Sequence, residues 1–243
     1  MDCVAQGARS QRRATTVAGA ELTGRSVVIP ALIAINVVIF VVTVMQARSL
    51  AEDAYTPLFL QWGLWPTVVA EGEWWRLFTS GFLHSSDFLG LGPAHLVFNM
   101  ITVWVIGRDL EQVLGQTRLL LVYLVSLLGG SLAVFLFADE NSLTVGASGA
   151  VLGLMGGLVV VLLRMRRSPR PVQAVILLTV VVSFVVPEIS LLGHLGGLVF
   201  GAAVTAGLVY APRDRRVTVQ AVTVIALLAA IAVGVLARNL QLG

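Results

Sequence analysis

The residues that could do chemistry in this chain are a serine, two histidines and an asparagine, all within or beside apolar sequence. Two of the three histidines, His95 and His194, fall in apolar stretches, and Ser148 begins another. Asn99 follows His95 by four residues, so on a helix both side chains lie on one face. A histidine that accepts the proton of a serine hydroxyl makes that serine a reactive nucleophile. Polar groups are costly inside a membrane span, so their presence there indicates function.

The elements that must position these residues are membrane-spanning helices. The chain is 57% hydrophobic and 12% charged, with a mean hydropathy of +0.91. Soluble domains carry roughly twice this charged fraction. Apolar stretches long enough to cross a bilayer predict an all-α polytopic membrane helix bundle. We expect seven spans, at 26–47, 88–107, 119–138, 141–163, 171–187, 189–212 and 217–237.

Arginines between these spans predict the orientation. All 16 basic residues are arginine, and 13 of them fall on one side of the membrane if the seven spans alternate in direction. The other three are Arg48, Arg76 and Arg238. Basic loops stay cytoplasmic, so the N-terminus is expected inside and the C-terminus outside. The first span is longer than the apolar region of a signal peptide, so we expect a signal anchor that is not cleaved.

The same pattern divides the chain into three parts. Residues 1–25 are expected to form a cytoplasmic basic tail, 26–211 a six-helix core, and 212–243 a linker with a seventh helix. The external segment 48–87 holds four of the five tryptophans. Tryptophan prefers the headgroup level, so this segment is expected to lie in the membrane interface. We expect a multi-pass protein of a cell membrane, and a bacterial inner membrane in particular.

This topology places the polar residues at similar depth. His95 and Asn99 fall in the outer half of the second span, and Ser148 at the outer end of the fourth. The sixth span starts outside near Glu188, from which about 9 Å of helix leads to His194. Three spans that are distant in sequence therefore bring a serine, two histidines and an amide to one layer.

Two glycine patterns predict that the fourth and sixth spans touch. Glycine recurs at every fourth residue in each, a face that lets helix backbones approach closely in lipid. The glycines are Gly149, Gly153 and Gly157 in the fourth span, and Gly193, Gly197 and Gly201 in the sixth. Ser148 and His194 each adjoin the outermost glycine of a face, so close packing could bring the hydroxyl within reach of the imidazole.

Four motifs on these spans resemble those of the rhomboid intramembrane serine proteases. They are Gly146-Ala147-Ser148-Gly149-Ala150, Gly193-His194-Leu195-Gly196-Gly197, His95-Leu96-Val97-Phe98-Asn99 and Trp75-Arg76. With the order of helices, the resemblance covers roughly residues 26–211. It implies the fold of six core helices, here with one helix added after them.

The resemblance also implies roles for the site residues. Ser148 would be the nucleophile and His194 its base, while His95 and Asn99 would donate to the oxyanion. The implied activity is a serine endopeptidase that hydrolyses peptide bonds in or near transmembrane segments of other proteins. Its partners would be transmembrane protein substrates and the lipid bilayer, and the chemistry requires no cofactor, metal or nucleic acid.

Two other functions are weighed against this one. A catalytically inactive rhomboid-like protein would bind and escort membrane helices, although both Ser148 and His194 are present here. A small-solute transporter would need an inverted repeat and broken helices, which the sequence does not show. The three histidines lie on separate elements and form no metal-binding motif.

Some polar residues are expected to have structural roles only. His84 is interpreted as a buried structural histidine, and Arg76 as an organiser of the external loop. Glu111 and Gly115, at the inner end of the second span, match a family position for which a structural role is expected.

Overall fold

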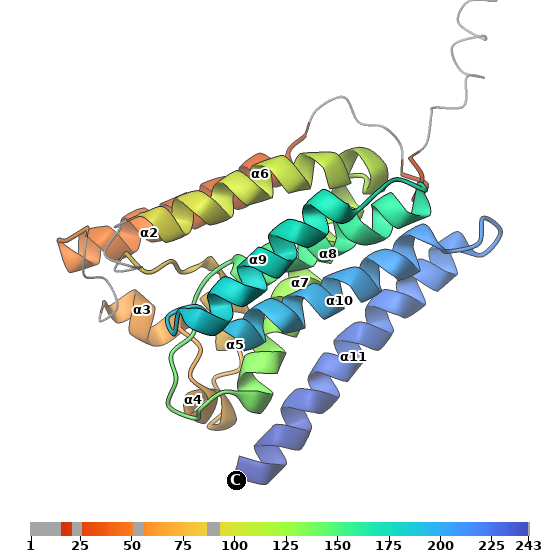
Figure 1. Cartoon of the computed structure of the whole chain (residues 1–243). Coiled ribbons are helices and arrows are strands. Elements are labelled where there is room, and N and C mark those ends of the chain that lie inside the picture. The colour runs from red at the N-terminus through yellow and green to blue at the C-terminus, as the bar shows by residue number, and fades with distance from the viewer. Residues whose placement is uncertain (1–15, 21–25, 51–55, 87–92, 243) are drawn as a thin grey trace, which may run out of the picture.

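The structure, a computed structural model, describes residues 16–20, 26–50, 56–86 and 93–242 (Figure 1). This described part is an all-helical bundle without β-strands, as predicted. Its long helices are α2 (Val28–Ala47), α6 (Ala94–Leu114), α7 (Gln116–Phe137), α8 (Ser148–Arg164), α9 (Arg170–Val185), α10 (Leu191–Val209) and α11 (Arg216–Leu242). Between α2 and α6 lie the short α3 (Pro57–Trp62), α4 (Pro66–Ala70), α5 (Arg76–Thr79) and the 3₁₀ helix η1 (Ser80–Phe82).

Most of the long helices have the composition of membrane spans. In the described part of the chain, α2, α7, α10 and α11 are long and apolar enough to cross a bilayer, and α8 and α9 are shorter apolar helices. Each of the seven predicted spans corresponds to one long helix. The chain is therefore a multi-pass membrane protein.

The predicted bounds of the second span, 88–107, were wrong. Helix α6 begins at Ala94, with Pro93 as its N-cap residue, and continues to Leu114. Proline is tolerated at a helix start because the backbone N–H that it lacks would have no intrahelical partner there. The predicted span ended at residue 107 because charged residues follow it in the sequence. In the structure the helix continues through these charged residues. Residues 87–92 lie outside the described part of the chain.

The predicted start of the fourth span, at residue 141, was also wrong. Helix α8 begins only at Ser148. Before it, Thr144 forms an isolated antiparallel bridge with Leu64, and Gly146 has a φ of +127°. A positive φ suits glycine and interrupts a helix, so the nucleophile candidate stands at the first position of α8.

The central contact of the bundle is that of α8 with α10, and of both with α7. A methyl group at Gly197 would overlap the backbone of Gly149, and one at Gly201 would overlap the backbone of Gly153. The predicted contact between the two glycine faces is therefore confirmed. Backbones come this close only where neither helix presents a side chain.

Helix α7 takes part in the same contact, which the sequence analysis did not anticipate. A Cβ atom on Gly130 would lie 2.7 Å from the carbonyl oxygen of Gly193. One on Gly196 would lie 2.5 Å from the carbonyl oxygen of Gly129. Three helices thus meet backbone to backbone beside Ser148 and His194.

The other long helices surround this centre (Figure 1). Helix α2 lies along α6, and α11 packs on α7 and α10. Helix α9 contacts α8 and α10, and Ser183 is its only buried residue. The remaining side chains of α9 are exposed or half-buried, as expected for a helix that faces lipid.

The predicted basic tail is described only at residues 16–20. These residues pack against the C-terminal end of α6, where the backbone N–H of Ala18 donates to the carbonyl of Val113 over 3.3 Å. Ala18 is fully buried. The other parts of that tail, 1–15 and 21–25, lie outside the described residues.

Glu111 and Gly115, for which a structural role was expected, lie at the same end of α6. The Ser26 hydroxyl donates to the Glu111 carboxylate over 2.5 Å, which joins the start of α2 to α6. Gly115 has a φ of +79° and forms the turn between α6 and α7. The predicted structural role of Glu111 and Gly115 is confirmed.

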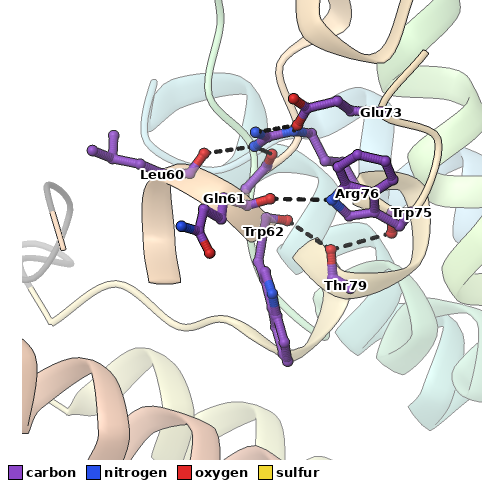
Figure 2. Close-up of polar contacts among 8 residues, drawn as sticks. Leu60, Gln61, Trp62, Glu73, Trp75, Arg76 and Thr79 are labelled. Carbon is purple, nitrogen blue, oxygen red and sulfur yellow. Dashed lines mark hydrogen bonds and ion pairs between the residues drawn. The ribbon is translucent and has the colours of Figure 1, made fainter. Parts of the chain in front are cut away.

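The connection between α2 and α6 is organised by the buried guanidinium of Arg76 (Figure 2). Its Nη1 donates to the carbonyls of Leu60 and Gly63, over 2.7 and 2.8 Å. Its Nε donates to the Glu73 carboxylate over 2.6 Å, and the group lies 5.6 Å from the ring centre of Trp65. Arg76 is thus a loop organiser, as predicted.

This connection holds the segment that leads into α8. The backbone N–H of Leu64 donates to the carbonyl of Thr144 over 3.1 Å, and the reverse bond measures 2.9 Å. The N–H of Gly146 donates to the carbonyl of Ser80 over 3.0 Å. Because Arg76 binds the residue before Leu64, its contacts extend to the turn that presents Ser148.

We predict that Gly197→Val destabilises the protein by about 1–3 kcal/mol or more, because overpacking a tight contact forces backbones apart. The measurement is thermal unfolding in detergent micelles. Ala229→Val in α11, where the side chain is exposed, is the control and should have little effect. Equal stability of the two variants would show that α8 and α10 are not in backbone contact.

We also predict that Arg76→Ala lowers stability by about 1–3 kcal/mol for each buried carbonyl left without a donor. Arg76→Lys should recover only part of the loss, since an ammonium cannot reproduce the planar fork of a guanidinium. The exposed Arg213→Ala is the control. Full recovery in the lysine variant would mean that charge alone, and not the fork geometry, holds the loop.

Candidate active site

The four predicted site residues line one cavity of about 200 Å³. His95 and Asn99 reach it from α6, Ser148 from α8 and His194 from α10. Thr179 of α9 and the segment before α10 complete its wall. Apolar side chains form much of the rest: Phe98, Val145, Val151, Leu152, Met155 and Ile189. Three helices that are separate in sequence therefore bring a hydroxyl, two imidazoles and an amide to one small space.

Ser148 is presented by a sharp turn at the start of α8. Gly146 has a positive φ, and a Cβ atom there would lie 2.8–2.9 Å from the ring of His95 and 3.7 Å from the Ser148 hydroxyl oxygen. Only glycine therefore fits this turn. As the first residue of a 17-residue helix, Ser148 has a backbone N–H without an intrahelical partner, at the positive end of the helix dipole. Such a terminus favours negative charge.

His194 lies in the first turn of α10 and is 3% exposed. The Ser190 side chain caps this helix by accepting from the N–H of Gly193 over 3.1 Å. The Nδ1 atom of His194 is 2.7 Å from the hydroxyl oxygen of Ser183. Its Nε2 atom is buried and has no hydrogen-bond partner within the described residues. The hydrogen bond predicted between Ser148 and His194 is thus not formed here, although both residues line the same cavity.

Asn99 and His95 form the wall contributed by α6. The Asn99 amide donates to the carbonyl of His95 over 2.8 Å. An amide carries two N–H groups, so a second donor remains beside the cavity. The His95 ring packs edge-on against His84, with ring centres 5.0 Å apart. Both predicted residues therefore lie at the site, on one helix face.

His84 supports the ring of His95, which agrees with the structural role expected for it. Burial, and then the neighbouring His95, hold the pKa of His84 well below its ordinary value, so it is neutral at pH 7. Sequence reasoning missed one residue beside the site, Ser183. Ser183 was not singled out because it is one hydroxyl in an apolar helix. A serine within the predicted span 171–187 was the only available signal.

A second cavity, of about 510 Å³, adjoins the first. The two share His95 and a short set of residues around it: Val145, Glu188, Ile189 and Ser190. Its wall includes polar residues from the loops at this end of the bundle: Ser85, Asp139, Ser142 and Thr144. A larger space of mixed polar and apolar lining thus adjoins the small, mostly apolar one.

No metal-binding cluster accompanies these residues. In the part of the chain that the structure describes, no three His, Cys, Asp or Glu side chains gather so that they could hold an ion.

Comparison with known proteins identifies the family. Residues 71–211 match the Rhomboid domain family. The chain is 38% identical to "Rhomboid protease GluP" of Bacillus subtilis, over 66% of this chain and 32% of that protein. It is 36% identical to "Putative rhomboid protease YdcA" of Bacillus subtilis, over 55% of this chain and 66% of that protein.

Another relative is "Rhomboid protease AarA" of Providencia stuartii, which is 29% identical over 64% of this chain and 63% of that protein. The alignments cover about one to two thirds of these curated relatives. The matched region includes all of α6 to α10, the helices that carry the four site residues. The family match covers more than half of the chain, which therefore belongs to the rhomboid family.

Proposed function

We propose that this protein is an intramembrane serine endopeptidase that uses Ser148 as nucleophile and His194 as general base. One observation carries the proposal: Ser148 and His194 line the same cavity, and the buried Nε2 of His194 has no hydrogen-bond partner among the described residues. A buried nitrogen without a partner is costly unless a reacting group uses it. The protease names of several relatives support the same reaction.

The first half of the proposed reaction forms an acyl-enzyme. When Ser148 and His194 come within hydrogen-bond distance, Nε2 takes the hydroxyl proton as the oxygen bonds to the scissile carbonyl carbon. The C–N bond then breaks, and the proton passes from Nε2 to the leaving amine. In the second half, His194 removes a proton from water, the hydroxide attacks the ester, and Ser148 recovers its proton.

The negative oxygen of each tetrahedral intermediate needs donors. We assign the free N–H of the Asn99 amide, His95 and the backbone N–H of Ser148. Each preorganised donor is worth about 2.7–4 kcal/mol in a site without water. The start of α8 adds the positive end of its dipole. Burial supports the assignment of Asn99 as an oxyanion donor, since its side chain is only 6% exposed.

The two cavities suggest how substrate and water reach the site. Apolar residues of the small cavity, such as Phe98, Leu152 and Met155, suit a side chain from a transmembrane segment. The larger cavity, with Ser85, Asp139 and Ser142 on its wall, suits water. We infer that this end of the bundle faces outward and that the N-terminus is cytoplasmic, because the topology predicted from the sequence assigns thirteen of the sixteen arginines to the cytoplasmic side.

The alternative is a rhomboid-like protein without catalysis that binds membrane helices. Several relatives bear the name "RHOMBOID-like protein" and not "protease", among them number 6 of Arabidopsis thaliana, which is 38% identical over 56% of this chain. Such a protein would keep the helix bundle but would have no use for an activated serine. Labelling by a serine-reactive fluorophosphonate separates the two functions.

We predict that Ser148→Ala abolishes fluorophosphonate labelling and cleavage of a transmembrane test substrate while the protein stays folded. His194→Ala should reduce both nearly as far, because the serine then has no base. Ser126→Ala is the matched control: it removes a buried hydroxyl that donates to its own helix over 2.6 Å. Cleavage by pure Ser148→Ala protein would refute the mechanism, and no labelling of the wild type would favour the inactive alternative.

We further predict that Asn99→Ala lowers kcat roughly 10²–10³-fold, the usual cost of one oxyanion donor. KM should change far less, because the bond matters most in the transition state. Asn36→Ala is the control, since this buried asparagine of α2 also donates to the carbonyl four residues before it, over 2.7 Å. A higher KM with unchanged kcat would instead make Asn99 a substrate contact.

A further inference from the structure

We propose that Ser183 of α9 is a positioning residue that keeps the proton of the neutral His194 imidazole on Nδ1, so that Nε2 can act as the base. The inference rests on the proposed function, in which Nε2 accepts the proton of Ser148. It concerns a residue on a helix that presents neither the nucleophile nor the base.

The burial of Ser183 sets it apart from the rest of its helix. It is 5% exposed and is the only buried residue of α9. Its neighbours Phe184 and Val185 are 80% and 70% exposed. A helix whose other side chains are exposed or half-buried thus turns one hydroxyl inward, onto the ring of His194. Burying a hydroxyl is costly unless its hydrogen bonds are made, and here they are.

The hydrogen bonds of Ser183 determine where the imidazole proton lies. Its hydroxyl donates to the carbonyl of Thr179 over 2.6 Å. A serine hydroxyl has one proton to donate, and here the proton is donated to Thr179. The Ser183 oxygen can therefore only accept a hydrogen bond from its second neighbour. The second neighbour is Nδ1 of His194, at 2.7 Å. Both bonds are satisfied together only if Nδ1 carries the hydrogen.

This tautomer is the one that the proposed reaction requires. In a neutral imidazole one nitrogen donates and the other accepts, and the bond at one nitrogen decides the state of the other. With hydrogen on Nδ1, Nε2 of His194 keeps its lone pair and has no hydrogen-bond partner among the described residues. His194 and Ser148 line the same cavity. With hydrogen on Nε2, it could take no proton from Ser148. An orienting partner on Nδ1 serves the same purpose in serine–histidine–aspartate enzymes.

No carboxylate performs this task in the described structure, since the Nδ1 contact is to a neutral hydroxyl. A hydroxyl orients the ring without stabilising an imidazolium as strongly as a carboxylate would. The position of α9 therefore influences His194 directly, through the contact of Ser183 with Nδ1. The same helix also supplies Thr179 to the cavity wall.

The first test is kinetic. Ser183→Ala should lower kcat by roughly 10–100-fold and leave KM unchanged. This is the range found when a metal-binding histidine loses the partner that orients its ring. Ser183→Thr restores a hydroxyl and should regain most of kcat. Ser126→Ala again serves as the control for loss of a buried helix hydroxyl. Wild-type kcat in Ser183→Ala would overturn the proposal.

The second test reads the tautomer without activity. Nitrogen chemical shifts of ¹⁵N-histidine-labelled full-length protein distinguish protonated from unprotonated ring nitrogens. The protein carries Ser148→Ala, and the signal of His194 is the one lost in His194→Ala. We expect hydrogen on Nδ1, and a shift of population toward Nε2 when Ser183→Ala is added. Unchanged Nδ1 protonation would overturn the proposal even if kcat fell, because the loss would then be structural.

The two tests also separate this proposal from the proposed function. If the wild type neither cleaves the test substrate nor reacts with fluorophosphonate, the protease function fails. The tautomer measurement still decides whether Ser183 orients His194. If the wild type is active and only the tautomer is insensitive to Ser183, the protease function stands and the role of Ser183 is refuted.

Discussion

The arrangement of this site depends on three helices that meet without side chains between them. Between helices in lipid there is no hydrophobic driving force, so close packing and hydrogen bonds must hold them together. Glycines make that packing possible where Gly197 meets the backbone of Gly149, and where Gly130 meets that of Gly193. Ser148 and His194 each precede or follow one of these glycines. The backbone contact that stabilises the bundle therefore also determines the distance between the proposed nucleophile and base.

A second, independent constraint acts on Ser148 from the loop side. The glycine contact positions α8 as a whole, but the direction of the Ser148 side chain depends on how the chain enters the helix. That turn is held by backbone hydrogen bonds from Gly146 to Ser80 and from Thr144 to Leu64. These bonds rely in turn on the loop around Arg76. Glycine packing in the bundle and hydrogen bonds from the loop thus both determine the position of Ser148.

The sequence predicted the parts of this arrangement that repeat or that cost energy. Glycine at every fourth residue indicated the contact of α8 with α10, and polar groups in apolar runs indicated His95 and His194. The contribution of α7 was missed because Gly129 and Gly130 are adjacent and form no such repeat. The start of α8 was misplaced because it depends on pairing with Leu64, far away in sequence. No local pattern contains that information.

Ser183 illustrates the remaining limit and also why the site needs a peripheral helix. Its sequence neighbours are all apolar, so only the tertiary packing of α9 shows that it turns inward. The glycine contact holds α10 rigidly but offers His194 no polar partner, because glycine has no side chain. An orienting group must then come from a helix outside the close contact. In this bundle we propose that Ser183 of α9 provides it, although Ser183 is the only buried residue of that helix.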